Sequence, residues 1–251
     1  MDTTAYLQRI GYQGAVAPDG HTLRALQLAH LLTVPFENLD IGWGREIVLD
    51  EGRILQKIVD ERRGGFCYEV NGAFAALLRS VGFPVDLLSA GVARKSGGFG
   101  PDYDHLVLRI DLAEPWLVDV GFGDSFREPL RLIPDLVQEQ AFGGYRFKCT
   151  GETWTLWQRE QQEWKPQYRF TLQPRTFDDF AAMCVFQQTA PESSFTQRRI
   201  CTIATPSGRI TLADRRLIIT ADGQRDESEL SDEAAFGAAL QRYFGIIPPN
   251  N

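Results

Sequence analysis

The stretch ERRGGFCYEVNGAFAALLRSVGF, residues 61–83, decides how this chain folds and what chemistry it can support. Two glycines lead to Cys67, where a helical pattern begins, with Val70 and Phe74 one turn apart on one face and Gly82 at the end. The N–H groups and partial positive charge of a helix start favour a thiolate over a thiol, and the thiolate is the nucleophilic form. We therefore interpret Cys67 as a candidate nucleophile, whose pKa we expect the helix start and a neighbouring imidazolium to lower.

The composition limits the kinds of partner that the chain can have. It has 251 residues, of which 43% are hydrophobic and 24% are charged, as in ordinary globular proteins. The net charge is -7 and no Lys/Arg run exceeds a pair, so nucleic acid and anionic membranes are not expected partners. No apolar run approaches the ~20 residues of a membrane span, and the start MDTTAYLQRIGYQG has no apolar signal core. We therefore expect a cytoplasmic protein.

The cysteines are far apart in the chain and have none of the spacings of zinc sites: they are Cys67, Cys149, Cys184 and Cys201. We therefore expect reduced thiols and no bound metal. Only Cys67 follows a glycine-rich approach to a helix, and we assign the other three no chemical role.

The hydrophobic pattern changes twice along the chain. Up to about residue 83 the apolar residues recur at helical spacing, and from there to about residue 190 short segments alternate like strands between turn residues. The last part combines strand patterns with a final helix, SDEAAFGAALQRYFG, which we expect Ser231 to cap. Helices followed by strands indicate an α+β fold with an antiparallel sheet or barrel in its middle.

A nucleophilic thiol needs a base, and the chain has three histidines. His21 lies at a helix start and His30 lies within an amphipathic helix, where surface or hydrogen-bonded histidines are common. His105 opens the strand pattern HLVLRI directly after a loop rich in glycine and aspartate, and loops at strand ends often carry catalytic groups. We therefore interpret His105 as the candidate base.

The group that orients this base is expected on the next strand. The segment RIDLAEPWLVDVGFGD has the pattern of a hairpin centred near residue 112, which places Asp119 opposite or diagonally beside His105. An acid between two valines is costly to bury unless it has a partner. Asp104 and Asp124 are weaker candidates, because the first points to the other face and the second follows the glycines. Together with Cys67 this gives a nucleophile, a base and an orienting acid; the alternative is that all three have only structural roles.

Several short motifs occur together in this chain. Along the sequence they are VPFENLDI (34–41), RGGFC (63–67) followed by YEVN, DHLVL (104–108) and LVDVGFGD (117–124). In this order and spacing they resemble the motifs of the arylamine N-acetyltransferases, and the likeness extends from YLQRIGYQG to about residue 200. The resemblance implies a helical bundle at residues 1–83, a central antiparallel β-barrel at 84–190 and a C-terminal α/β lid at 191–251, with a catalytic core like that of cysteine peptidases. It also carries the triad of the family onto Cys67, His105 and Asp119.

The resemblance further implies a reaction. The thiolate of Cys67 attacks the thioester of acetyl-coenzyme A, coenzyme A leaves, and an arylamine or arylhydrazine takes the acetyl group from the cysteine. His105 accepts the proton of the amine, and Asp119 fixes the tautomer of the imidazole. Acetyl-coenzyme A is then a co-substrate, no metal takes part, and the activity belongs to xenobiotic metabolism. The backbone N–H of Cys67 is the expected donor to the oxyanion.

The same resemblance assigns roles to residues outside the triad. Those expected to line the pocket of the acceptor amine are Phe36, Val92, Phe122 and Phe195, and those whose backbone can approach the pyrophosphate of coenzyme A are Gly121 and Gly123. Glu37 and Arg63 are expected to form an ion pair between the VPFENLDI segment and the loop before Cys67. Glu69 and Asn71 are interpreted only as polar residues of the helix start.

Other functions use the same features. An amide synthase that closes a polyketide chain on its own aryl amine needs the same triad and a wider pocket mouth. A cysteine hydrolase would pass the acyl group to water, and a binding module would keep the triad without using it. The sequence leaves open the natural acceptor amine, the acyl length, the coenzyme contacts and the oligomeric state.

Overall fold

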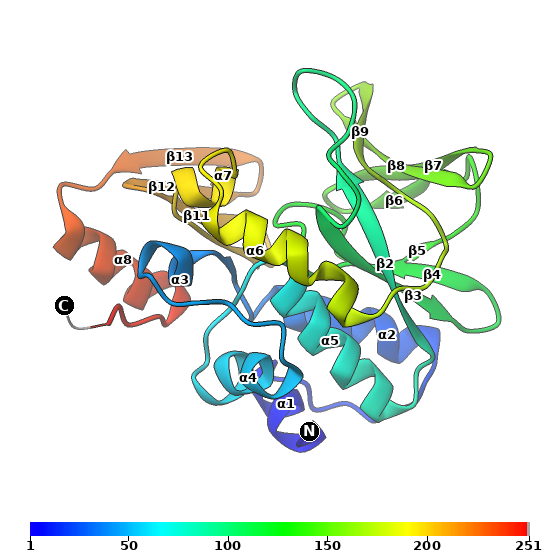
Figure 1. Cartoon of the computed structure of the whole chain (residues 1–251), viewed down its shortest axis with the longest axis horizontal. Helices are drawn as coiled ribbons and strands as arrows, with labels where there is room; N and C mark the ends of the chain where they lie inside the picture. The colour runs from blue at the N-terminus through cyan, green and yellow to red at the C-terminus, as the bar shows by residue number, and fades with distance from the viewer. Residues whose placement is uncertain (250–251) are drawn as a thin grey trace.

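The helix that starts at Cys67, α5 (Cys67–Val81), is central to the computed structural model, which describes residues 1–249. It lies between the other N-terminal helices and the first strands of the larger sheet (Figure 1). The other helical elements are α1 (Thr3–Arg9), α2 (Gly20–Leu31), α3 (Leu39–Gly42), α4 (Glu51–Leu55), the π-helical η1 (Gln56–Asp60), the 3₁₀-helical η2 (Phe177–Phe180), α6 (Ala181–Thr189), α7 (Ser194–Gln197) and α8 (Glu233–Phe244). Within residues 1–249, none of these helices is long and apolar enough to cross a membrane.

The ends of the helices follow local sequence rules. α5 ends at Gly82, whose φ of 99° suits glycine. α8 is capped by Asp232, whose side chain accepts the N–H of Ala235 at 2.8 Å, so the prediction of Ser231 as the cap is wrong. The helix begins one residue later than expected, and the hydroxyl of Ser231 donates to the carboxylate of Asp232 instead.

The larger sheet is antiparallel and has the strand order β5-β4-β3-β2-β9-β8-β7-β6. Its strands are β2 (Val85–Val92), β3 (His105–Asp111), β4 (Pro115–Val118), β5 (Leu130–Arg131), β6 (Gln138–Gln140), β7 (Gly143–Thr150), β8 (Thr153–Glu160) and β9 (Glu163–Phe170). It curls into a nearly closed barrel, and its edge strands are joined by a side chain, because Gln138 exchanges hydrogen bonds of 2.8 and 3.0 Å with the backbone of Arg131. The expected barrel is therefore confirmed.

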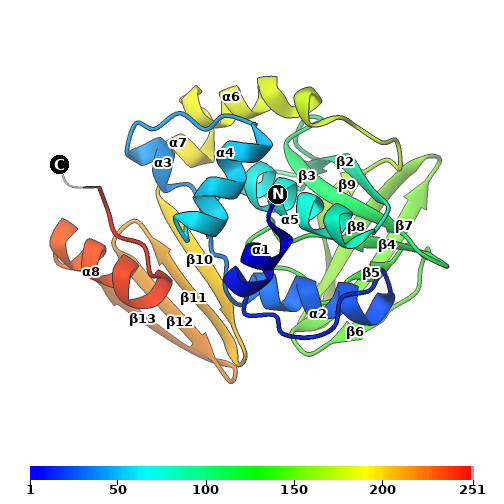
Figure 2. The ribbon, with the colours of Figure 1, turned by 90° about the horizontal axis from the view of Figure 1, so that it is seen from below.

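The smaller sheet has the order β1-β10-β11-β12-β13. Its strands are β1 (Phe36–Glu37), β10 (Ile200–Thr205), β11 (Gly208–Ala213), β12 (Arg216–Ala221) and β13 (Gln224–Glu229). One face packs apolar side chains such as Leu212 against Phe236 and Leu240 of α8, which Figure 2 shows on the outer side of the sheet. β1 comes from the N-terminal part of the chain and pairs with β10, with Phe36 opposite Thr202.

The expected α+β fold, with a helical bundle, a barrel and an α/β lid, is confirmed by this arrangement. The sequence did not indicate β1, a short strand of the N-terminal part that completes the lid sheet. It also did not indicate η2 and α6, which are helical where we expected strands. The domain boundaries at residues 83 and 190 stay a prediction.

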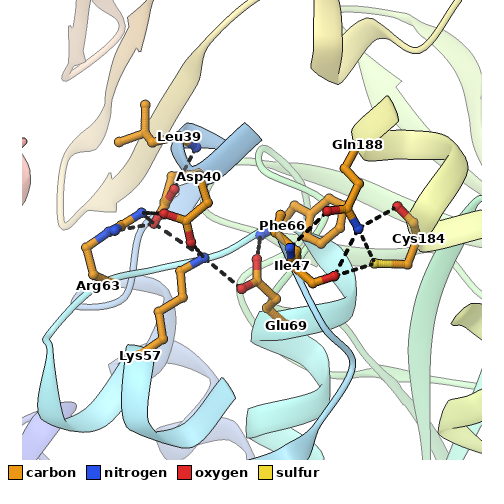
Figure 3. A network of polar contacts seen from close by, with 10 residues as sticks. Leu39, Asp40, Ile47, Lys57, Arg63, Phe66, Glu69, Cys184 and Gln188 are labelled. Carbon is orange, nitrogen blue, oxygen red and sulfur yellow. Dashed lines mark hydrogen bonds and ion pairs between the residues drawn. The ribbon is translucent and has the colours of Figure 1, made fainter. Parts of the chain in front are cut away.

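A network of buried charges lies beneath the start of α5 (Figure 3). Arg63 donates to the carboxylates of Glu37 at 2.7 Å and Asp40 at 3.0 Å, which confirms the predicted pair of Glu37 and Arg63. Lys57 forms ion pairs of 2.7 Å with Asp40 and with Glu69. Burial opposes the charge of Lys57, but the carboxylates around it raise its pKa above the usual range. Burial raises the pKa of Glu69 to about 7 in spite of Lys57, whose charge is shared among the carboxylates.

This network fixes the segment of chain that leads to Cys67. A carboxylate oxygen of Glu69 accepts the backbone N–H of Phe66 at 3.1 Å and so caps the start of α5. Gly64 lets the loop touch the VPFENLDI segment, because a Cβ atom there would lie 1.9 Å from the carbonyl oxygen of Pro35. The charges and this close contact together set where the helix begins.

Replacing Arg63 with methionine is expected to lower the free energy of unfolding by about 3 kcal/mol, because it leaves buried carboxylates with Lys57 as their one cation in the network. Methionine keeps an apolar stem beside Trp43, over which the guanidinium lies at 4.7 Å, so the loss reports on the charge. Urea denaturation measures the loss, and Arg53→Met, at an exposed arginine of α4, is the control. An equal loss in both variants would show that the buried carboxylates do not depend on Arg63 as a partner.

Candidate active site

Cys67 is the first residue of α5, and only 3% of its surface is exposed. It lines a cleft of about 460 Å³ to which the helical part, the barrel and the smaller sheet all contribute. The four cysteines are free thiols, and in the described chain Cys67 is the one that reaches this cleft. Its position therefore suits a nucleophile that meets its substrate in a nearly dry site.

His105, the first residue of β3, lines the same cleft and is backed by Asp119. Nε2 of the imidazole lies 2.8 Å from a carboxylate oxygen of Asp119, and both residues are buried. The hairpin register, with Leu108 opposite Val118, places Asp119 diagonally from His105, which is one of the two placements that the sequence allowed. Because the carboxylate holds the ring proton at Nε2, Nδ1 is the nitrogen that can accept a proton.

Asn71, one turn after Cys67 on α5, holds this carboxylate in place. Its amide nitrogen donates to Asp119 at 2.9 Å and to the carbonyl oxygen of Leu106 at 2.7 Å, and its amide oxygen accepts the N–H of Val120 at 2.9 Å. The interpretation of Asn71 as no more than a polar residue of the helix start is therefore corrected. Its spacing of four residues from Cys67 was the available signal, since such residues share a helix face.

The residues that we expected to bind the substrates line this cleft together with Cys67 and His105: they are Phe36, Val92, Gly121, Phe122, Gly123 and Phe195. The ring of Phe122 packs against the imidazole of His105 with 5.3 Å between centroids, and the rings of Phe36 and Phe195 lie 6.1 Å apart. The wall beside the imidazole is therefore aromatic.

The cleft also contains polar residues that the sequence analysis did not identify as site residues. They are Arg94, Asp104, Asp124, Gln187, Ser194, Arg198, Thr202, Arg209 and Thr211. These residues come from the loops beside β2, β3 and β4, from α6 and α7 and the segment after them, and from the strands of the lid, so no single local motif joins them. Asp104 is already occupied, because its carboxylate accepts the N–H of Val92 at 3.2 Å and the amide of Gln187 at 2.8 Å.

Gly121 allows the loop after β4 to touch the start of α5. A Cβ atom at this position would lie 2.8 Å from Cα of Cys67 and 2.6 Å from the amide nitrogen of Asn71. This packing accounts for the glycine without any ligand. That the backbone of Gly121 and Gly123 approaches a pyrophosphate stays a prediction.

The environment of the Cys67 thiol acts against the effect that we expected from the helix start. Burial raises the pKa of Cys67 well above its ordinary value, the backbone N–H of Leu106 lowers it, and the charges of Asp119 and Asp104 raise it further. Burial and these carboxylates therefore act against the lowering that we expected from the helix start, and a thiolate of Cys67 paired with the imidazolium of His105 stays a prediction. A thiolate at neutral pH needs a base in the cleft to take the proton, and the imidazole of His105 lies in that cleft.

Comparisons with known proteins find relatives over nearly the whole chain. A family model described as N-acetyltransferase matches residues 19–248. The arylamine N-acetyltransferase of Escherichia coli is 36% identical over 245 residues, which are 96% of this chain and 87% of the relative. The solved structure of the arylamine N-acetyltransferase from Salmonella typhimurium has a TM-score of 0.92 at 33% identity and covers 97% of this chain and 90% of that one. The arylamine N-acetyltransferase of Mycobacterium marinum in complex with CoA has a TM-score of 0.91 at 34% identity, with coverages of 98% and 93%.

Replacing His105 with glutamine is expected to slow alkylation of Cys67 by iodoacetamide at pH 7 more than about tenfold, because each unit by which the thiol pKa exceeds the pH lowers the thiolate fraction about tenfold. In the variant, alkylation should rise only at alkaline pH, whereas the wild type stays reactive at neutral pH because His105 takes the proton. Peptide mass spectrometry measures both rates, and the exposed thiol of Cys149 is the internal reference. Equal rates at pH 7 in the two proteins would contradict a role for His105 as the base.

Proposed function

The chain belongs to the arylamine N-acetyltransferase family, and from this premise we propose that it transfers an acetyl group from acetyl-coenzyme A to arylamines and arylhydrazines through an acetyl-cysteine at Cys67. The observation that carries the proposal is that Cys67 and His105 line one cleft, with the buried Asp119 2.8 Å behind the imidazole. A nucleophile, a base and an orienting carboxylate are the parts that covalent acyl transfer requires.

The first half-reaction loads the cysteine. Nδ1 of His105 takes the thiol proton, and the sulfur of Cys67 attacks the carbonyl carbon of the thioester to give a tetrahedral intermediate. The backbone N–H of Cys67 stabilises the oxyanion, and Asp119 stabilises the imidazolium that forms. The intermediate expels the sulfur of coenzyme A, which takes the proton from His105 and leaves as a thiol.

The second half-reaction restores the enzyme. The nitrogen of the amine attacks the acetyl carbonyl, and His105 accepts the proton that the amine loses. The new tetrahedral intermediate releases the N-acetylated product, and the sulfur of Cys67 recovers its proton from His105. Because coenzyme A leaves before the amine reacts, the mechanism is ping-pong.

The aromatic side chains of the cleft support an aromatic acceptor. We propose that Phe36, Phe122 and Phe195, with Val92 beside them, hold the ring of the amine in front of the acetyl-cysteine. The same side chains keep water away from a productive position, which is needed because water is far more concentrated than any amine. This exclusion would separate the transferase from a cysteine hydrolase with the same triad.

Acetyl-coenzyme A has to enter the cleft from solvent. We propose that the backbone of Gly121 and Gly123 approaches its pyrophosphate, since both glycines line the cleft beside Phe122. A related arylamine N-acetyltransferase, from Mycobacterium marinum, is described in complex with CoA, which supports this class of donor. A mechanism that needs a reduced thiol fits the cytoplasm, where we place the reaction.

Acetyl-coenzyme A without an amine is expected to add one acetyl group to the chain at Cys67, and aniline should then remove it. Intact mass spectrometry and peptide mapping measure this adduct. Cys67→Ala should give neither adduct nor transfer while its stability changes little, because the lost thiol is small. Cys149→Ala, at an exposed thiol outside the cleft, is the matched control. Acetyl transfer by Cys67→Ala would exclude the covalent mechanism.

Phe122→Ala is expected to lower the rate of aniline acetylation at least about tenfold and to raise the rate of acetyl-coenzyme A hydrolysis. The aniline ring loses the side chain that packs against it, and water can reach the acetyl-cysteine. Phe186→Ala, at an exposed phenylalanine of α6 that does not line the cleft, should change neither rate. Chromatography of the acetylated product and a colour assay of the released thiol measure the two rates.

Two results would favour the other functions. Hydrolysis as fast in the wild type as in Phe122→Ala, without an acetyl adduct, would favour a cysteine hydrolase. An adduct that no member of a panel of anilines and hydrazines discharges would favour an amide synthase.

A further inference from the structure

The lid sheet presents a polar face to the cleft. Side chains alternate along a strand, and in β11 Arg209 and Thr211 line the cleft, whereas Leu212 belongs to the core on the other face, against α8. Thr202 in β10 is paired with Thr211 and lies on the same side of the sheet. Arg209 therefore projects a guanidinium into the cleft from a rigid strand, and only 12% of its side chain is exposed.

The guanidinium of Arg209 has few partners for a buried cation. Its Nε lies 3.1 Å from a carboxylate oxygen of Asp124, but the direction is wrong for a hydrogen bond. Within residues 1–249 its side chain donates one hydrogen bond, of 3.1 Å, to the hydroxyl of Thr202. A guanidinium has five N–H donors, so most of them are available to a ligand in the cleft. Burial lowers the pKa of Arg209, which shows that the site disfavours the cation unless an anion is near.

The carboxylate that faces Arg209 is held only loosely. Asp124 ends the LVDVGFGD motif, and 79% of its side chain is exposed, so it regains hydration easily when it leaves the pair. In the same loop Arg127 donates hydrogen bonds to the carbonyl oxygens of Thr205 and Gly208, at the turn between β10 and β11. The backbone of the lid is thus tied to the loop by Arg127, and the side chain of Asp124 can move without separating them.

The cleft is lined by more cations than anions, although the net charge of the chain is -7. Arg94 and Arg198 line the same cleft as Arg209, while the carboxylate of Asp104 already accepts hydrogen bonds from Val92 and Gln187. An exposed carboxylate is therefore the one loosely held anion among several cations in the part of the cleft that the structure describes. Phosphate groups bind arginine through paired, charge-assisted hydrogen bonds and would compete with it.

We propose that Asp124 is a displaceable counter-ion of Arg209: a phosphate group of the acyl donor takes the place of its carboxylate, so that this pair selects phosphate-bearing donors over uncharged thioesters. The inference rests on the proposed acetyl transfer and adds a determinant of donor specificity to it. Asp124 lowers the affinity of the empty cleft for anions in general. A donor therefore has to carry a group that binds Arg209 more strongly than the hydrated carboxylate of Asp124 does.

The test compares two donors that carry the same reacting thioester. Acetyl-coenzyme A has phosphate groups, and S-acetyl-N-acetylcysteamine has none. The quantity measured is the ratio of kcat/KM for the first donor to kcat/KM for the second, with aniline as the acceptor. Arg209→Gln should lower this ratio at least about tenfold, because it removes a hydrogen bond between the guanidinium and a charged phosphate group. Asp124→Asn should raise the ratio, because the competing charge is gone. Arg216→Gln, which removes a cation from β12 outside the cleft, is the control.

The opposite signs of the two variants distinguish a counter-ion from a structural tie between loop and lid. If Asp124→Asn lowers the ratio as Arg209→Gln does, or if Arg209→Gln leaves the ratio within about twofold of the Arg216→Gln control, the inference is overturned. Should Arg209→Gln fail to fold, the sign of the Asp124→Asn effect decides alone. A wild type that takes acetyl groups from neither donor overturns the proposed function as well, whereas transfer from both donors with an unmoved ratio overturns only this inference.

Discussion

The burial of one carboxylate, that of Asp119, is the constraint on which the geometry around Cys67 depends. Only 2% of this residue is exposed, and an acid without partners there would cost several kcal/mol. Its oxygens are satisfied by the imidazole of His105, the amide of Asn71 and the N–H of Gly121. These groups come from β3, from α5 and from the loop after β4. Satisfying one carboxylate therefore fixes the candidate base, the helix that carries the candidate nucleophile and the wall of the cleft relative to one another.

A second set of buried charges acts on the other side of the same helix start. Arg63 and Lys57 bind carboxylates from the VPFENLDI segment, and Lys57 also binds Glu69 in the first turn of α5. Buried ion pairs add little net stability compared with apolar packing, but they tolerate few alternative arrangements. The VPFENLDI segment supplies Phe36 to the cleft, so this network sets the position of a ring that lines the cleft as well as that of Cys67.

The cleft exists because segments distant in the chain meet there. β1 pairs with β10, which attaches the lid to the N-terminal part by backbone hydrogen bonds, and Arg127 attaches the barrel loop to the turn between β10 and β11. The lid is therefore a fixed wall, and its polar face adds Arg209 and Thr211 to a site that Phe36, Phe122 and Phe195 also line. Aromatic side chains for an aromatic acceptor and arginines for an anionic donor fit the two kinds of substrate in the proposed reaction.

The sequence by itself determined the α+β order of elements and the groups of the candidate triad, because each has a local signal: glycines before Cys67, a strand that opens at His105, an acid between valines at Asp119. Only the tertiary structure decided what depends on contacts between distant segments. The short strands β1, β5 and β6 have almost no periodicity and are held by pairing, and the role of Asn71 appears only when α5 meets the hairpin. The burial that raises the pKa of Cys67 could not be predicted from the sequence for the same reason. The partial charge of a helix start follows from a few adjacent residues, whereas desolvation depends on every group that packs around the sulfur.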